Sequence, residues 1–206
     1  MSAKQSINRR FLLQQMTALS FGAAVSPAIA FAGNSVNAFS GDAESSTIYL
    51  SPGEGKKGKV GEMEIVFKLE KTQTQGHLGV WESVIQPGEL GAIPHYHNQY
   101  DEICRVVMGS VCIMTNEVVT EVKAGGWHLR PKGVIHTFWN SGSVPASTID
   151  MSVPAGHEFY MQDLAKLFEN NHRPRKEDLM QLSEKHDIHY RFDLLEAILK
   201  KYKVKL

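Results

Sequence analysis

The sequence predicts an all-β core that folds as a small antiparallel β-barrel or sandwich and is followed by an α-helical extension. Two patterns lead to this prediction. Between residues 58 and 155, β-branched and aromatic segments alternate with Pro, Gly, Asn or Ser at intervals of about 8–12 residues, as in antiparallel β-structures. After Pro154, apolar residues recur instead at the spacing of about 3.6 residues that marks amphipathic helices. We therefore expect a core over 58–155 and a helical extension over 156–206.

Eight segments of the core have the composition of strands. They are residues 62–70, 77–86, 102–108, 111–115, 118–122, 127–130, 136–140 and 147–153. The pair Gly109-Ser110 predicts a two-residue hairpin between the third and fourth segments. In that hairpin Cys104 and Cys112 lie on opposite faces of one sheet, so we expect no disulfide between them.

Three groups of apolar positions predict helices in the extension. They run from Phe159 to Phe168, from Leu179 to Leu182 and from Leu194 to Leu199. Asn170-Asn171 and Pro174 break the pattern between the first two groups. The final residues, KKYKVKL, place lysines at alternate positions and predict a solvated tail.

The first 32 residues predict a signal peptide that is cleaved from the mature protein. Lys4, Arg9 and Arg10 precede an apolar run that ends in small-residue triplets. The paired arginines followed by apolar residues resemble the twin-arginine export signal, although Asn8 and Gln14 depart from its preferred residues. A general secretory signal is the alternative. Either route predicts a periplasmic or secreted protein without a stable membrane anchor.

The remainder of the N-terminus and the charge balance narrow the class of protein. Residues 33–57 are rich in Gly, Ser, Ala and Asn and predict a flexible arm. Removing residues 1–32 takes three basic residues from a chain with 22 basic and 22 acidic residues, which leaves a formal charge of −3. This balance disfavours a nucleic-acid partner.

Two histidines and a glutamate lie close together in the segment PHYHNQYDE. His95 and His97 are two residues apart, so on a strand their imidazoles point to one face at a separation of about 7 Å. Glu102 follows the reversal at Asn98 to Asp101 and begins the next strand. There its carboxylate can approach the same point from a neighbouring strand about 5 Å away. Such convergence of imidazole and carboxylate predicts a metal site.

The same segment resembles the first motif of the cupin superfamily. In that motif one residue separates two histidines, three or four residues lead to a glutamate, and six more lead to a glycine. His95, His97, Glu102 and Gly109 match it. The glycine that precedes the motif in the family is displaced, because Gly88 lies one residue too early.

A second segment, GGWHLRPKGVIHTFWN, resembles the second cupin motif and provides the fourth ligand. Gly125, Pro131, Gly133, His136 and Asn140 match without a gap. One departure is a second glycine where the family commonly has an aspartate, and it removes no metal ligand. The resemblance covers about residues 60–155 and implies a cupin barrel, or jelly roll, with His95, His97, Glu102 and His136 as the metal ligands.

The order of barrel and helices also resembles bacterial single-domain cupins described as quercetin 2,3-dioxygenase-like. The ligand set of three imidazoles and a carboxylate implies one divalent transition-metal ion. Fe or Mn is favoured because the twin-arginine route would load the ion in the cytoplasm, and Ni, Cu or Zn are alternatives. Four ligands on a six-coordinate ion leave positions for a small-molecule substrate and O₂. Glu102 is also the candidate catalytic base.

These features predict a metal-dependent oxygenase that acts on a small enol-containing or phenolic compound. A cupin isomerase or lyase would use the same four ligands. A non-catalytic periplasmic protein that binds a small molecule or a metal is the alternative from a different class, because one fold hosts many functions. An ion that only ties strands together is a further alternative, although structural ions usually have closed shells. Edge strands of small barrels often pair between subunits, so a homodimer is expected.

The remaining conspicuous residues are expected to be structural. His128 is expected to be a packed or surface histidine rather than a fifth ligand. Four aromatic residues could line a pocket but are more often core: Trp81, Trp127, Phe138 and Trp139. The other histidines have no partner at ligand spacing and are expected at the surface: His77, His157, His172, His186 and His189.

Overall fold

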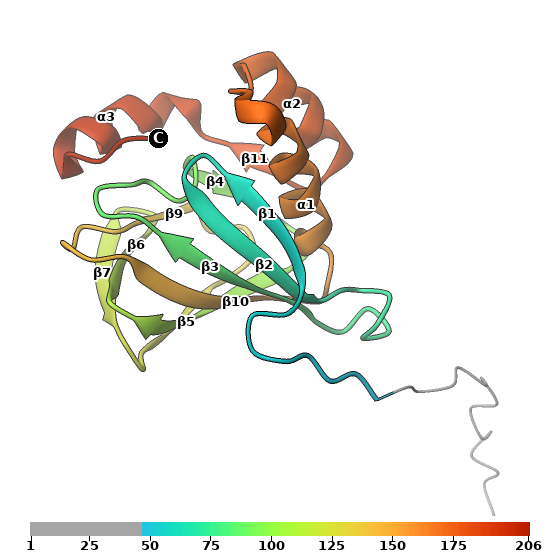
Figure 1. Ribbon diagram of the computed structural model, residues 1–206. Coiled ribbons are helices and arrows are strands. Elements are labelled where there is room, and N and C mark those ends of the chain that lie inside the picture. Colours follow the sequence, from blue (N-terminus) through green and yellow to red (C-terminus); the bar gives the residue numbers. More distant parts are fainter. Residues whose placement is uncertain (1–46) are drawn as a thin grey trace, which may run out of the picture. The chain divides into compact units, whose positions relative to one another are not determined.

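The computed structural model describes residues 47–206, which form two antiparallel β-sheets with three α-helices gathered on one side of them (Figure 1). The signal peptide predicted for residues 1–32 lies outside the described residues, as do positions 33–46 of the predicted arm. Both therefore stay predictions. The all-β core with a helical extension is confirmed, and its strands form a two-sheet jelly roll rather than one closed barrel.

The first sheet has six strands, and the second has five. In spatial order the first sheet contains β1 (Lys56–Val60), β2 (Met63–Leu69), β3 (Gly79–Ile85), β10 (Ala146–Val153), β5 (Asp101–Met108) and β8 (Trp127–Arg130). The second contains β11 (His189–Tyr190), β4 (His95–Tyr96), β9 (His136–Trp139), β6 (Ser110–Thr115) and β7 (Val118–Lys123). All eight predicted strand segments are present. The structure adds β1, which takes the last two residues of the predicted arm, and the short β11.

Alternation along the strands separates an inner face from an outer face. In β3, every second residue from Gly79 to Ile85 is buried, and β5 and β10 show the same period of two. Apolar inner positions such as Ile65, Val106 and Ile113 form the main core between the sheets. Polar residues also occupy the inner face. Buried polar groups of this kind indicate a site inside the jelly roll.

The predicted hairpin at Gly109-Ser110 is wrong. The residues do connect β5 to β6, but β5 pairs with β10 and β8 whereas β6 pairs with β7 and β9. Gly109 has a φ of 71°, a conformation that suits glycine, and it carries the chain from one sheet to the other. Cys104 and Cys112 are both free thiols: Cys104 is buried in the main core and Cys112 is half-buried.

Three helices follow the last strand, as the apolar spacing predicts. They are α1 (His157–Leu167), α2 (Lys176–Lys185) and α3 (Phe192–Tyr202), with the 3-10 turn η1 (Glu169–Asn171) after α1. Asn170 has a φ of 56° inside that turn and ends the helical run there. Tyr160, Met161 and Leu164 on α1 pack against the main core. The helices among residues 47–206 all fall short of the length and apolarity that a membrane crossing needs.

The C-terminal tail is packed rather than solvated, which corrects the prediction from its lysines. The Lys205 carbonyl accepts a hydrogen bond of 2.8 Å from the Leu90 N–H, and the Lys205 N–H donates one of 3.0 Å to the Gly88 carbonyl. Val204 is buried beside Ile198 in a second apolar cluster. The lysine side chains point to solvent, so charge at alternate positions here marks one exposed face of a bound segment.

Candidate metal centre

The two sheets together assemble the predicted ligand set. His95 on β4 lies opposite His136 on β9 in the second sheet, and His97 follows directly after β4. Glu102 comes from β5 in the first sheet, so its carboxylate reaches the cluster across the interior. The prediction that Glu102 lies on a strand next to the histidines is therefore wrong, although its convergence with them holds. One ligand atom from each of these four buried residues lies within 4.8 Å of every other.

Hydrogen bonds to the backbone set the tautomers of two of the imidazoles. His95 Nδ1 lies 2.8 Å from the Ile93 carbonyl, and His136 Nδ1 lies 2.9 Å from the Val134 carbonyl. A carbonyl oxygen only accepts, so each Nδ1 carries the proton and donates it. Each Nε2 consequently presents its lone pair to the centre of the cluster, which is the arrangement found for histidines that bind metals.

The acceptor atoms at the centre lack partners within residues 47–206. The Nε2 atoms of His95, His97 and His136 and the Oε2 atom of Glu102 are buried without a hydrogen bond. His136 Nε2 is 2.9 Å and His97 Nε2 is 3.4 Å from Glu102 Oε2. Two acceptors at that separation repel one another unless a cation lies between them. Ligand distances of about 2.1 Å place neighbouring donors about 3 Å apart, so these two separations suit a divalent transition metal.

Burial and neighbouring charges shift the pKa values of the cluster. Loss of solvation lowers the pKa of His95 well below its ordinary 6.5, and His136 lowers it further. The pKa of His136 is lowered by the same loss of solvation. Burial alone would raise the pKa of Glu102, but the charge of Arg130 and the contacts with His157 and His136 hold that pKa well below its usual range. His95 and His136 are therefore neutral and Glu102 is ionised, as metal ligands must be.

His157 is buried beside the cluster, so the expectation of a surface histidine is wrong. It is the first residue of α1, and its Nε2 lies 3.0 Å from Glu102 Oε1. Its Nδ1 lies 2.7 Å from the Tyr100 hydroxyl. The hydroxyl can donate to Nδ1 while the Nε2–H donates to Oε1, which leaves Oε2 to face His97 and His136. No sequence spacing signals this contact, because α1 reaches the cluster only through tertiary packing.

Arg130 is a second residue at the site that the sequence analysis does not identify. Its side chain is buried on the inner face of β8, where Nη2 donates a hydrogen bond of 2.8 Å to Asp150 Oδ1 and Nη1 lies 3.5 Å from Glu102 Oε2. Thr148 donates a hydrogen bond of 2.6 Å to the other oxygen of Asp150. A charged residue at an inward position of a strand is a signal that could have revealed it.

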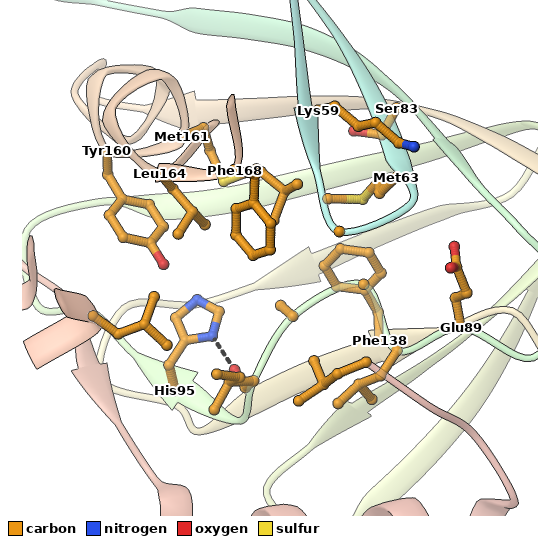
Figure 2. Close-up of a pocket in the computed structure, with 18 of the residues that line it drawn as sticks. Lys59, Met63, Ser83, Glu89, His95, Phe138, Tyr160, Met161, Leu164 and Phe168 are labelled. Atoms are coloured by element: carbon orange, nitrogen blue, oxygen red, sulfur yellow. Dashed lines mark hydrogen bonds between the residues drawn. The ribbon is translucent and has the colours of Figure 1, made fainter. Parts of the chain in front are cut away.

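The cluster opens into a cavity of about 400 Å³ between the sheets and α1. His95, Glu102, Arg130 and His157 line its polar end. Apolar side chains form most of the remaining wall: Met63, Trp81, Leu90, Ile93, Phe138, Met161, Leu164 and Phe168. Figure 2 shows His95 and Phe138 facing the side chains of α1 across this space, with Lys59 and Glu89 farther from His95. The site is therefore accessible to a small molecule with an apolar body.

The other predicted residues divide between wall, core and surface. Trp81 and Phe138 line the cavity, whereas Trp139 is buried in the second apolar cluster and Trp127 is 59% exposed. His128 is half-buried on β8 and outside the four-residue cluster. Three of the remaining histidines are exposed, namely His77, His172 and His189. His186 is half-buried beside Asp163.

Residues 81–152 match the family model of the cupin domain. The matched segment runs from β3 to β10 and contains all four residues of the cluster. The match covers 72 of the 206 residues and does not include β1, β2, β11 or the helices. A search of curated proteins finds no match.

Solved structures that are similar to this chain include the following three. A predicted oxalate decarboxylase from Thermotoga maritima is 18% identical over 52% of this chain and 99% of that one, with a TM-score of 0.49. KdgF from a Halomonas species is 17% identical over 54% and 99%, with a TM-score of 0.48. An RmlC-like cupin from Shewanella frigidimarina is 17% identical over 55% and 96%, with a TM-score of 0.46.

Replacing His97 by Ala should abolish stoichiometric metal binding while the protein stays folded, because the change removes one of four converging donors. Elemental analysis after loading with one divalent ion, together with circular dichroism, measures both effects. His128→Ala is the matched control and should retain the ion, because His128 lies outside the cluster. One ion per chain in His97→Ala would exclude His97 from the ligand set.

Replacing His157 by Leu should weaken metal binding by about 10–100-fold, the usual effect of removing a group that orients a ligand. Tyr100→Phe removes the hydroxyl beside His157 Nδ1 and should act in the same direction with a smaller effect. Competition titration with a metal chelator gives both dissociation constants. The control is His186→Leu, since His186 contacts Asp163 instead. An unchanged dissociation constant in His157→Leu would contradict the orienting role.

The metal-free protein should lose stability as the pH falls below about 6.5. In the unfolded chain His95 and His136 take up protons near 6.5, whereas their lowered pKa values keep them neutral in the folded state until lower pH. The unfolded state then binds more protons, and each imidazole contributes at most about 1.4 kcal/mol per pH unit. Urea denaturation on both sides of this pH measures the slope. The double variant His95→Gln/His136→Gln should have a flatter slope; an equally steep one would refute this assignment.

Proposed function

We propose that the protein is a metal-dependent oxygenase that acts on a small enol-containing or phenolic compound. The observation that carries the proposal is the position of the donor cluster: His95 and Glu102 line the polar end of a cavity of about 400 Å³ with a largely apolar wall. A donor set that opens into such a cavity suits a ligand better than a closed structural site does. The proposal includes export from the cytoplasm, which rests on residues 1–32.

A divalent transition-metal ion held by the four side chains would supply Lewis acidity and, if it is iron or manganese, redox chemistry with O₂. The chain itself sets the charge that a substrate meets. The imidazoles of His95 and His136 are neutral and Glu102 carries one negative charge, so a divalent ion leaves about one positive charge uncompensated. This favours a ligand with an anionic or easily ionised oxygen.

The cavity wall binds the body of the substrate and keeps water away from it. Trp81 and Phe138 offer aromatic surfaces, and Met161, Leu164 and Phe168 cover the cavity from the helical side (Figure 2). Apolar surfaces of this kind favour a planar enol or phenol over a fully hydrated sugar-like ligand.

Glu102 remains the candidate base, and its surroundings limit that role. The hydrogen bond from His157 and the charge of Arg130 stabilise the ionised carboxylate, so its basicity is low in the position observed. Proton abstraction by Glu102 requires the carboxylate to turn away from Arg130. The Glu102→Gln variant lacks this carboxylate. It should therefore show a larger loss of turnover than of substrate binding.

The test is O₂ consumption by protein loaded anaerobically with iron or manganese and then mixed with flavonols, catechols or diketones. We expect uptake of O₂ with at least one of these classes, and none from the metal-free protein or His97→Ala. Conversion of a compound without O₂ uptake would favour an isomerase or lyase. Tight binding without conversion of any compound would overturn the enzymatic proposal in favour of a binding protein.

A further inference from the structure

Arg130 has more hydrogen-bonding capacity than its surroundings use. A guanidinium offers five N–H donors, yet among the described residues Arg130 makes one hydrogen bond, from Nη2 to Asp150. Its Nε is buried without any partner, and its Nη1 lies 3.5 Å from Glu102 Oε2, which is too long for a strong hydrogen bond. The residue is 2% exposed and still lines the cavity. A buried cation with unused donors next to a cavity indicates a place for an acceptor from a ligand.

The neighbouring carboxylates do not account for these donors. Asp150 is shared between Arg130 and Thr148, whose hydroxyl donates a hydrogen bond of 2.6 Å to it. Glu102 is committed to the metal cluster and to His157, 3.0 Å away. A fixed fork of N–H groups matches the two oxygens of a carboxylate better than any single acceptor.

The position of Arg130 also relates it to the metal centre and to the apolar wall. Its guanidinium lies beside Glu102, and the Phe138 ring covers one side of it, with 5.5 Å between the Arg130 Cζ and the ring centroid. A ligand carboxylate at Arg130 would therefore place the atoms next to it near the metal ligands and its body against Phe138 and Trp81.

We infer that Arg130 binds a carboxylate group of the substrate, so that the substrate is a small apolar or aromatic carboxylic acid whose enol or phenol oxygen lies at the metal centre. This inference rests on the proposed function for the enol or phenol oxygen, whereas the carboxylate site rests on Arg130 and the cavity. While its enol or phenol oxygen keeps its proton, such a ligand carries one negative charge, which matches the charge left over by a divalent ion and Glu102. A phosphate ester, with up to two negative charges, fits this balance less well.

The simpler role for Arg130 is to neutralise the buried carboxylates of Glu102 and Asp150. That role predicts no preference between a carboxylate ligand and its uncharged amide beyond what the metal itself provides. The two roles can be separated by removing Arg130 together with Asp150, since the double change Arg130→Met/Asp150→Asn leaves the net charge of the site unchanged. Replacing both members of a buried ion pair also avoids an unpaired buried charge, which would unfold a single variant.

The experiment compares salicylate with salicylamide, which keep the same hydroxyl group and differ in the carboxylate. Protein loaded with zinc, which has no redox chemistry, is titrated with each compound by calorimetry. We expect salicylate to bind at least about tenfold more tightly than salicylamide, in line with hydrogen bonds to a charged group. In the double variant this preference should fall below about twofold. Elemental analysis confirms one zinc per chain in both proteins.

Arg105→Met is the matched control, because Arg105 lies on β5 with its guanidinium over the half-exposed ring of Trp127 outside the cavity. It should keep the full preference for salicylate. A preference of equal size in the double variant would show that the metal alone selects the carboxylate and would overturn the inference, as would equal binding of the two compounds by the unmodified protein. Neither measurement requires turnover. The test of the carboxylate site therefore stays valid even if the O₂ experiment fails.

Discussion

The structure depends on four buried ligand atoms, one each from His95, His97, Glu102 and His136, that face one another inside a jelly roll without a hydrogen bond to any of residues 47–206. Their close approach is held by the fold, because the backbone carbonyls of Ile93 and Val134 take the Nδ1 protons and leave the Nε2 lone pairs directed inward. Acceptors at such distances repel one another in a space removed from water. A cation at this point would relieve that repulsion, so binding an ion would also stabilise the packing of the two sheets.

A second set of side chains surrounds the ligands and constrains them from the other side. His157 holds one oxygen of Glu102 and receives support from Tyr100, while Arg130 brings a positive charge near the other oxygen. These contacts come from α1, from β8 and from the loop before β5. Side chains outside the four-residue cluster therefore decide the orientation and the charge state of the Glu102 carboxylate.

The helical extension adds walls to the cavity that the matched segment 81–152 begins. Tyr160, Met161 and Leu164 from α1 form one wall of the cavity. Tyr190 lies on β11, which pairs with β4, and also lines the cavity. The C-terminal tail packs against the loop at Gly88 to Leu90, whose Leu90 is also a wall residue. Parts of the chain outside the matched segment thus help to shape the cavity, whereas the four residues of the donor cluster all lie within that segment.

The sequence by itself determined the strand and helix pattern and the four converging residues His95, His97, Glu102 and His136. The strand and helix pattern follows from local rules, because alternation and turn residues decide where a side chain points within a few positions. The set of four residues, His136 above all, is what the resemblance to the cupin motifs implied. The hairpin at Gly109 and the solvated tail were predicted wrongly, since local composition does not say which sheet a strand joins or what a tail packs against. His157 and Arg130 reach the site only through packing between distant elements. Only the tertiary structure could decide those contacts, because burial and partners are properties of the assembled interior and not of spacing along the chain.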